Sequence, residues 1–542
     1  MKDKFFKSGE HWVWFNAGAI AISLVMVVGL ILLIAVRGLS HFWPADVVVF
    51  ETQGVDGQTQ FAMGEIYGEE VPKGQDPEVA KQILLKTGNR DLYGLDFRWL
   101  KIKEIVAQTR RDDVMVLERR EWGNFYGFLK SVNVDGSEFA NSDSAEANQQ
   151  LELLIDRANE LHEQVKEIEK DDIGSINYDI EQLRLERRRL QLEDADTPEA
   201  IAEIREQETK LNAEFEVLQA KMNELYRDAK RDSVVMESID GKTVTINGMD
   251  IVMAFQPNQM GLFSKIGHYF KKAAEFIWDE PREANTEGGV FPAIFGTVMM
   301  VILMSIMVTP FGVVAAVYLH EYAKQGFVTR LIRIAVNNLA GVPSIVYGVF
   351  GLGFFVYFLG GSIDELFYPE AKPAPTFGTS GLLWASITLA LLTLPVVIVS
   401  TEEGLSRIPK SIREGSLALG ATKIETLWRT VLPMASPAMM TGLILAIARA
   451  AGEVAPLMLV GVVKLAPTLP VDGNFPFVHL ERKFMHLGFH IYDVGFQSPN
   501  VEAARPLVYA TAFLLVLVII LLNITAIKIR NRLREKYKSL EH

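Results

Sequence analysis

The chain contains no cysteine, and this excludes disulfide bonds and thiolate metal sites. The absence does not fix the compartment, although it suits a domain exposed to an oxidising periplasm. The sequence also lacks a P-loop (Gly-x4-Gly-Lys-Ser/Thr), and no Ser/His/Asp constellation is identifiable. We interpret the nine histidines as scattered surface or core side chains and predict no metal site. The sequence therefore predicts a protein that forms a transport path rather than an enzyme, and no cofactor bound by this chain.

Charge is unevenly distributed along the 542 residues. Asp and Glu outnumber Lys and Arg between residues 39 and 285, whereas the remainder is mildly basic. With a pI near 5.4 and no dense face of Arg and Lys, the chain is not expected to bind nucleic acid. The pattern indicates an acidic soluble insert within a membrane protein.

Six apolar stretches are each close to the roughly 20 residues that cross a bilayer. They are residues 15–36, 293–319, 334–359, 382–400, 438–463 and 507–527. The first has the layout of a signal peptide, but it is too long and ends at Arg37, with Phe42 and Trp43 beyond. We therefore predict a retained transmembrane helix that enters from the cytoplasm.

Basic residues gather on one side of these stretches, which sets the orientation. That side holds Lys2, Lys4, Lys7, Lys324, Arg330, Arg333, Arg407, Lys410, Arg413, Lys423, Arg429, Lys528, Arg530, Arg532, Arg534, Lys536 and Lys538. The opposite short loops hold only Lys372, Lys464, Arg482, Lys483 and Arg505. The positive-inside rule then predicts an inner-membrane protein with both termini in the cytoplasm and residues 39–285 in the periplasm.

The insert shows two kinds of periodicity. Short alternating runs predict β-rich parts at 44–140 and 231–256, with Asp240-Gly241 as a hairpin turn. Between them, residues 143–230 carry a heptad seam, and Thr197-Pro198 is a good helix start. The economical structure is an antiparallel helical hairpin that interrupts one β-rich domain.

A further amphipathic helix is predicted at residues 260–280, with apolar residues opposite Lys265, Lys271 and Lys272. It is expected to lie on the outer membrane surface, or to pack on its own domain. The predicted fold class is thus an all-α membrane core of six transmembrane helices with an α+β periplasmic insert that contains an antiparallel coiled coil. The predicted parts are 1–38, 39–285, 286–530 and a cytoplasmic tail, 531–542.

The loop at 402–437 carries the most specific motif. Its segment Ile412-Arg-Glu-Gly-Ser-Leu-Ala-Leu-Gly420, followed by Leu432-Pro433, resembles the cytoplasmic loop of ABC-importer membrane subunits. The wider run from Leu394 to Glu453 resembles the phosphate-specific permease subunits known as PstA. The resemblance implies that a helix here docks into an ATP-binding subunit. The matching coupling residues are Arg413, Glu414, Gly415, Ser416, Gly420 and Pro433, where Gly415 and Ser416 replace two alanines of the family pattern.

The same resemblance implies a fold and a set of partners. The expected fold is the type I ABC importer permease, which forms the path of an ATP-driven phosphate importer. The implied partners are a second, homologous permease, two ATP-binding subunits and a periplasmic phosphate-binding protein, with ATP and Mg²⁺ held by the ATP-binding subunits. The substrate would be inorganic phosphate. The resemblance says nothing of the insert, which could dock the binding protein or a partner permease's extension, or contact the cell wall.

Arg449 and Glu453 stand four residues apart inside an apolar stretch. An Arg at such a depth costs about 2.5–3.5 kcal/mol on insertion scales, so it needs a partner, water or a function. A guanidinium can hold two oxygens of a phosphate, and we expect Arg449 to contact the anion while Glu453 neutralises it when the path is empty. The alternative is a structural bridge that fixes helix packing.

The third stretch is interrupted by Pro343, between Gly341 and Gly348. Broken helices expose backbone polar groups to a substrate path, or else let helices approach closely. The candidate path residues in this stretch and at the similar break of the second stretch are Asn338, Ser344, Tyr347 and Thr309.

Two other functions remain open from the sequence. The same kind of ATP-driven importer could transport another oxyanion, such as sulfate or molybdate. A membrane-anchored coiled-coil scaffold without transport is the other alternative, although it would not need the Arg449/Glu453 pair or an intact loop.

Overall fold

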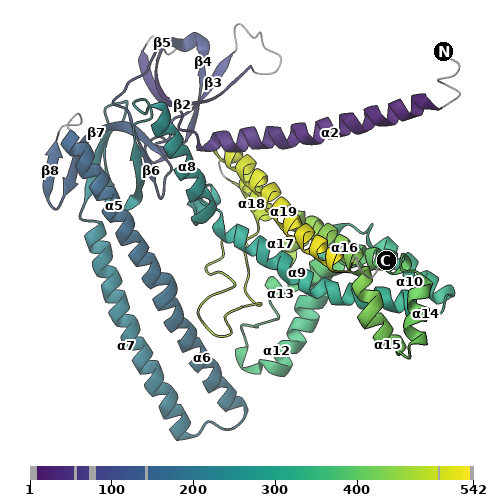
Figure 1. The fold of residues 1–542 in the computed structure, drawn as a ribbon. Coiled ribbons are helices and arrows are strands. Elements are labelled where there is room, and N and C mark those ends of the chain that lie inside the picture. The colour runs from purple at the N-terminus through teal and green to yellow at the C-terminus, as the bar shows by residue number, and fades with distance from the viewer. Residues whose placement is uncertain (1–8, 54–57, 72–80, 141–144, 499–500, 538–542) are drawn as a thin grey trace.

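The computed structural model describes residues 9–53, 58–71, 81–140, 145–498 and 501–537 (Figure 1). Lys2, Lys4, Lys7 and Lys538, which contributed to the predicted orientation, lie outside these ranges. Within the described residues, six helical stretches are long and apolar enough to cross a membrane, so the predicted number of spans is confirmed. They are His11–Phe42, Phe291–Tyr322, Ser344–Phe367, Leu382–Ser406, Lys423–Gly452 and Ala504–Lys536.

Helix α13 (Leu382–Ser406) is the centre of the membrane core. It packs against α9 (Phe291–Val317) and α16 (Leu432–Gly452), and α16 in turn packs against α19 (Val501–Tyr537). Small residues allow close approach. A Cβ added to Gly442 would lie 2.6 Å from that of Ser400, and one on Gly404 would lie 2.6 Å from that of Ala438. Such contacts replace the hydrophobic driving force, which is weak between helices in lipid.

The first span, α2 (Glu10–Leu39), contacts the rest of the chain only near its end. Its apolar side chains are exposed along most of its length, and in Figure 1 the helix projects away from the core. Gly38 anchors it, since a Cβ there would lie 2.8 Å from the backbone of Ala510 in α19.

The third span differs from the predicted range 334–359. Residues 334–339 belong to a separate amphipathic helix, α10 (Phe327–Leu339), which ends before Pro343. The span itself runs through α11 (Ser344–Phe350), a π-helical segment η7 (Gly351–Gly360) and α12 (Gly361–Phe367). Proline disfavours helix in the residue before it, so the apolar run on both sides of Pro343 forms two helices rather than one.

The fifth span also departs from its predicted range, 438–463. Helix α16 ends at Gly452, Glu453 is extended (φ −81°, ψ 131°), and a short helix α17 (Leu457–Val460) follows Pro456. Glycine is a poor helix former and proline cannot donate a hydrogen bond, so the chain breaks between them.

The insert contains two antiparallel sheets, shown together at the top of Figure 1. The first has the strand order β4-β3-β2-β1-β5: β4 Phe97–Lys101, β3 Gln82–Lys86, β2 Thr59–Glu70, β1 Val47–Gln53 and β5 Ile105–Thr109. The second has the order β10-β9-β7-β6-β11, with β8 also paired to β7: β10 Thr243–Asn247, β9 Ser233–Glu237, β7 Phe125–Val134, β6 Met115–Arg119, β11 Ile251–Phe255 and β8 Ser137–Ala140. Alternating apolar side chains such as Val47, Val49 and Val116 form a core within this domain.

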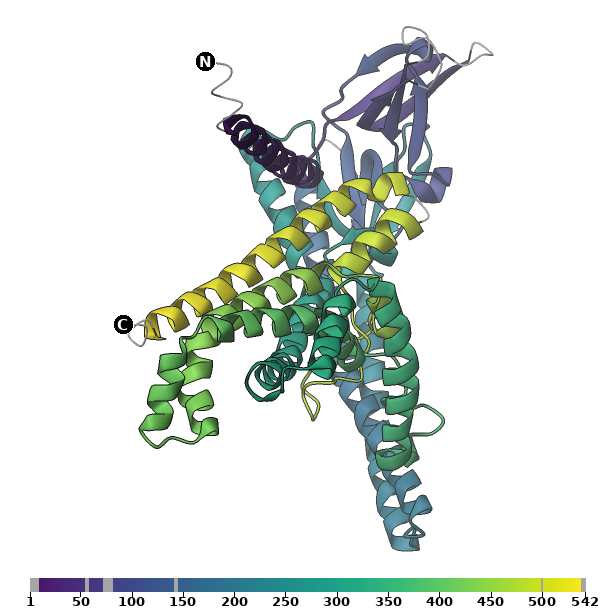
Figure 2. The same cartoon turned by 90° about the vertical axis from the view of Figure 1, so that its right-hand side faces the viewer.

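Strands β7 and β9 pair directly, although the helices α5 to α7 separate them in the sequence. Helix α5 (Ala145–Glu167) covers the second sheet and continues through a π-helical turn, η3 (Ile168–Asp172), into α6 (Ile173–Leu192). Helix α7 (Pro198–Ala229) returns alongside, and its N-cap residue Thr197 accepts a hydrogen bond from the amide of Ala200. These helices extend from the sheets beside the membrane core (Figure 2).

The helical arm contacts the core at two loops. Arg189 on α6 pairs with Glu370 at 2.8 Å, and the Glu370 side chain is only 3% exposed. Nearer the sheets, the hydroxyl of Tyr178 donates to the carbonyl of Phe475. The loops that follow α12 and α17 are therefore both held by the insert.

Helix α8 (Leu262–Trp278) leads into α9 with its polar side turned inward. Lys265 pairs with Asp46 at 2.5 Å and Lys272 pairs with Glu118, so both lysines face the sheets. Phe263, Phe270 and Trp278 are instead 89%, 67% and 69% exposed. The helix thus packs on its own domain and also presents an open aromatic face.

Candidate functional site

The 402–437 loop folds as two short helices joined by a tight turn. Helix α14 (Lys410–Ala418) is followed by Gly420 at φ +88°, a left-handed conformation that glycine adopts without strain. Helix α15 (Lys423–Thr426) begins with a capping box between Thr422 and Glu425. Pro433 follows a π-helical turn, η9 (Leu427–Val431), at the start of α16, inside a helix that runs without a break from Lys423 to Gly452.

The predicted coupling residues divide into two groups. Glu414 and Gly415 are exposed, and a Cβ on Gly415 would meet nothing within 4 Å, so the alanine of the family pattern would fit there. Ser416 points inward, with its hydroxyl 2.9 Å from that of Thr426, and thereby joins α14 to α15. The outer surface also bears Leu417 and Leu419, which are 47% and 91% exposed. Exposed apolar side chains beside a carboxylate are suited to a protein interface.

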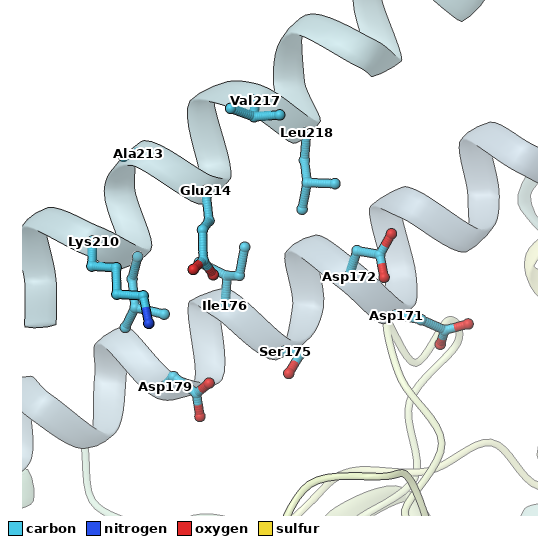
Figure 3. Close-up of a pocket in the computed structure, with 11 residues that line it drawn as sticks. Asp171, Asp172, Ser175, Ile176, Asp179, Lys210, Ala213, Glu214, Val217 and Leu218 are labelled. Atoms are coloured by element: carbon cyan, nitrogen blue, oxygen red, sulfur yellow. The ribbon is translucent and has the colours of Figure 1, made fainter.

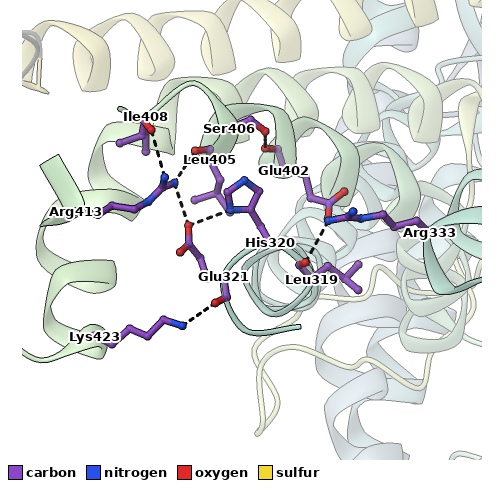
Figure 4. Close-up of polar contacts among 10 residues, drawn as sticks. All are labelled: Leu319, His320, Glu321, Arg333, Glu402, Leu405, Ser406, Ile408, Arg413 and Lys423. Atoms are coloured by element: carbon purple, nitrogen blue, oxygen red, sulfur yellow. Dashed lines mark hydrogen bonds and ion pairs between the residues drawn. The ribbon is translucent and has the colours of Figure 1, made fainter. Parts of the chain in front are cut away.

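Arg413 belongs to the inward group. Its Nη2 donates to the carbonyl of Leu405 at 2.8 Å and lies 3.0 Å from Oε1 of Glu321, while Nη1 donates to the carbonyl of Ile408 (Figure 4). Glu321 lies in a π-helical turn, η6 (Tyr318–Tyr322), that completes α9. Both side chains are mostly buried, at 18% and 12% exposure. Arg413 thus ties α14 to the ends of α9 and α13.

Lys423 attaches the second loop helix to the same place. Its Nζ donates to the carbonyl of Glu321 at 2.7 Å and lies 4.2 Å from the ring centre of Tyr322. Oε1 of Glu321 also lies 3.0 Å from Nδ1 of His320. Glu321 is therefore held by α14 through its carboxylate and by α15 through its carbonyl. The sequence analysis missed Glu321 and His320; the available signal is an acidic residue in a loop that otherwise carries Lys324, Arg330 and Arg333.

A second ion pair lies beside this junction. Arg333 on α10 contacts Glu402 on α13 at 3.4 Å and donates to the carbonyl of Leu319. The two residues line a cavity of about 130 Å³ together with Asn337 and apolar side chains of α10 and α13. The contact joins α10, α13 and the end of α9.

Arg449 and Glu453 form the predicted ion pair, with Nε 3.5 Å from Oε1. Their side chains are 32% and 21% exposed. Glu453 is the C-cap residue of α16 and has extended backbone, just beyond the last helical residue. The pair bridges the end of a helix to the segment after it, so the guanidinium lies at a helix break.

The other candidate path residues are placed differently from one another. The hydroxyl of Tyr347 on α11 donates to the carbonyl of Leu339 at 2.7 Å, and that of Thr309 donates to the carbonyl of Ser305 within its own helix. Both donor protons are thus already used. Asn338 is exposed on α10, outside the span, and Ser344 opens α11 with partial exposure.

Helix α11 meets the break after α16 at van der Waals distance. A Cβ on Gly348 would lie 2.7 Å from Cα of Pro456, so only glycine fits. Tyr347 is next to Gly348 in α11. The structure therefore brings the segment of Tyr347 to the break that follows Arg449 and Glu453, and leaves Asn338 and Thr309 on other elements.

Two histidines stand at the His-x3-His spacing that metal ligands often use, a pair passed over in the sequence analysis. They are His486 and His490. Nδ1 of His486 accepts the amide of Gly488 at 3.1 Å and so caps α18 (Leu487–Tyr492). Burial lowers the pKa of each to about 4. In the ranges that the structure describes, no three potential ligands gather to hold a metal.

Comparison with known proteins places this site in a family. Residues 308–535 match the family described as binding-protein-dependent transport system inner membrane component. A phosphate transport system permease protein PstA from Yersinia pestis is 30% identical over 311 residues, which cover 55% of this chain and 96% of that protein. The PstA protein of Mycobacterium leprae is 39% identical over 188 residues, or 34% of this chain and 56% of that protein.

Other relatives are matched over less of their length. The probable ABC transporter permease YqgH of Bacillus subtilis is 34% identical over 193 residues, 35% of this chain and 59% of that protein. The chain spans little more than half the length of several such relatives. Among solved structures, an inward-facing MetNI methionine ABC transporter is 19% identical with a TM-score of 0.33, covering 44% of this chain and 94% of that chain. Because the match to the Yersinia pestis protein covers nearly all of that relative, this chain belongs to the PstA family of phosphate transport system permease proteins.

Proposed function

We propose that this chain is the permease subunit of an ATP-driven phosphate importer of the inner membrane. The observation that carries the proposal is the loop at 402–437, whose outer face is open while its inner face is bonded to the end of α9. A docking helix needs both properties, because it must accept a partner and pass the partner's movement to the spans. The chain has no P-loop, so ATP and Mg²⁺ belong to two partner ATP-binding subunits, and the permease itself is not an enzyme.

The proposed path runs beside Arg449. Its guanidinium offers several donors in a planar fork that suits two oxygens of a phosphate, and its partial exposure leaves room for contact. Glu453 balances the charge when no anion is present, as a buried cation requires. A second permease, homologous to this one, would close the path, and a periplasmic phosphate-binding protein would deliver the anion.

The proposed orientation places both termini in the cytoplasm and residues 39–285 in the periplasm. The bias of Lys and Arg toward the loops on the other side of the spans supports it. The open aromatic face of α8 directly precedes the span α9 and suits a membrane interface, which would hold the insert near the membrane surface. The paired helices of the insert would then lie over the periplasmic loops of the core, which Arg189 and Tyr178 already contact. We assign these helices as an antiparallel coiled coil.

Reconstitution tests the proposal. Proteoliposomes with the full set of subunits should take up radiolabelled phosphate when ATP is supplied inside, and omission of the ATP-binding subunit should abolish uptake. Uptake that persists without that subunit would overturn the importer assignment.

Another tetrahedral oxyanion is the second candidate, because a guanidinium fork fits sulfate or molybdate as well. Excess unlabelled sulfate or molybdate should leave phosphate uptake unchanged. Competition by either anion as effective as that by phosphate would reassign the substrate.

A further inference from the structure

Helices α6 and α7 of the insert leave an open groove of about 760 Å³ between them (Figure 3). One wall comes from the turn of η3 and α6 at residues 171–179, and the other from α7 at residues 210–218. Small side chains lie on both walls, Ser175 on α6 and Ala213 on α7. They do not fill the space between the helices, so the groove stays open.

The floor of the groove is apolar. Ile176, Leu211 and Leu218 line it, and Val217, which is 68% exposed, lies at its edge. A valine on a helix surface gains stability only when another apolar group covers it, at about 25 cal/mol per Å² of buried area. The floor therefore has the character of one half of an interface.

The rim is mainly acidic. Asp171, Asp172, Asp179 and Glu214 line the groove against a single Lys210. In the part of the chain that the structure describes, none of these four carboxylates has an ion pair or a side-chain hydrogen bond. By contrast, Glu181 in the next turn of α6 is bonded twice by Arg184. The groove thus concentrates carboxylates that are free to receive positive charge.

We infer that this groove docks a helix from a different protein on the same side of the membrane, with an apolar stripe flanked by Lys and Arg. Apolar floor and acidic rim together match such a helix, by the helix-in-groove mode of recognition. A second copy of this chain does not fit, because the whole insert is acidic and two inserts would repel each other. The partner is therefore a distinct, basic chain.

The groove lies close to the core. Asp179 on its rim is adjacent to Tyr178, whose hydroxyl holds the carbonyl of Phe475 in the loop after α17. The inference goes beyond the proposed function, because phosphate transport does not require any occupant of the insert.

Two synthetic helical peptides of about 18 residues, or five turns, test the inference. Both carry a leucine stripe, flanked by lysine in one and by glutamate in the other, with a fluorescent label. The full chain in nanodiscs of neutral phosphatidylcholine should raise the anisotropy of the lysine peptide, whereas empty nanodiscs and the glutamate peptide should give little signal. Equal binding of both peptides, or none by the lysine peptide, would overturn the inference.

Variants then locate the binding. Val217→Asp, and separately the pair Asp172→Asn with Asp179→Asn, should each weaken the lysine peptide at least about tenfold. The matched control is Glu203→Gln with Glu206→Gln, which removes the same charge from exposed positions of α7 outside the groove. Its effect should stay below about twofold, with unchanged helical circular dichroism in every variant. A control that loses as much affinity as the groove variants would show general charge attraction and refute the site.

Discussion

Arg413 and Glu321 come from two different loops between the spans, and their side chains meet 3.0 Å apart, largely buried. Arg413 belongs to the helix that we propose docks on an ATP-binding subunit, and Glu321 lies in the turn that completes α9. A displacement of α14 must therefore break this contact or pull α9 along. The cost of unpairing two buried ions favours the second outcome.

We predict that Arg413→Ala and Glu321→Gln each reduce ATP-driven phosphate uptake about tenfold. Either change leaves a largely buried charge without its partner, a penalty of about 1–3 kcal/mol. The double variant should be no worse than the single ones, because contacting residues act as one unit. Radiolabelled uptake in proteoliposomes measures all three.

The matched control for this pair is Glu403→Gln. Glu403 and its partner Arg407 are 3.9 Å apart and highly exposed. An exposed pair contributes little, so uptake should stay within about twofold of wild type. Strictly additive losses in the double variant would argue against a direct link between α14 and α9.

Arg449→Lys should keep the charge next to Glu453 but lose the fork that can hold two anion oxygens. We expect the KM for phosphate to rise about tenfold with normal assembly of the complex. Wild-type uptake in this variant would leave Arg449 only the structural role of bridging the break after α16.

Glu287→Gln should stabilise the protein in a pH-dependent way. Burial raises the pKa of Glu287 to about 7, whereas its carboxyl in the unfolded chain titrates near the ordinary 4.5. The folded state thus holds an extra proton between pH 4.5 and 7, and stability falls as the pH rises through that window. At pH 8 the free energy of unfolding of the variant should exceed that of wild type by about 3 kcal/mol, and near pH 4 the two should be equal.

Thermal unfolding of the full chain, followed by tryptophan fluorescence at both pH values, checks this prediction. Glu203→Gln, an exposed change on α7, serves as control and should shift neither melting temperature. A gain that is the same at pH 4 and pH 8 would contradict the titration of Glu287.

The absence of cysteine makes the proposed orientation directly measurable. Glu203→Cys in the insert and Arg407→Cys in the loop at 402–437 each introduce a single exposed thiol. A membrane-impermeant maleimide should label the first in intact spheroplasts and the second only after permeabilisation. The reverse pattern would invert the topology.

Periodicity and length predicted the six spans correctly, because the need to cover backbone in lipid leaves little freedom. The break at Pro343 was predicted, but the ranges 334–359 and 438–463 were wrong, because a hydropathy window continues through a residue that ends a helix. The residues that contact Arg413 could not be predicted from the sequence either. Glu321 and the carbonyls of Leu405 and Ile408 approach it only through the packing of separate helices, which no local pattern encodes.

The contact between Gly348 and Pro456 limits how this chain can move in the proposed transport cycle. Because the two backbones are too close to admit even a methyl group, α11 has no room to slide past the broken segment after α16. We therefore expect these elements and Arg449 to move together. In the proposed importer, the path would then open where this chain faces a second permease rather than within its own fold.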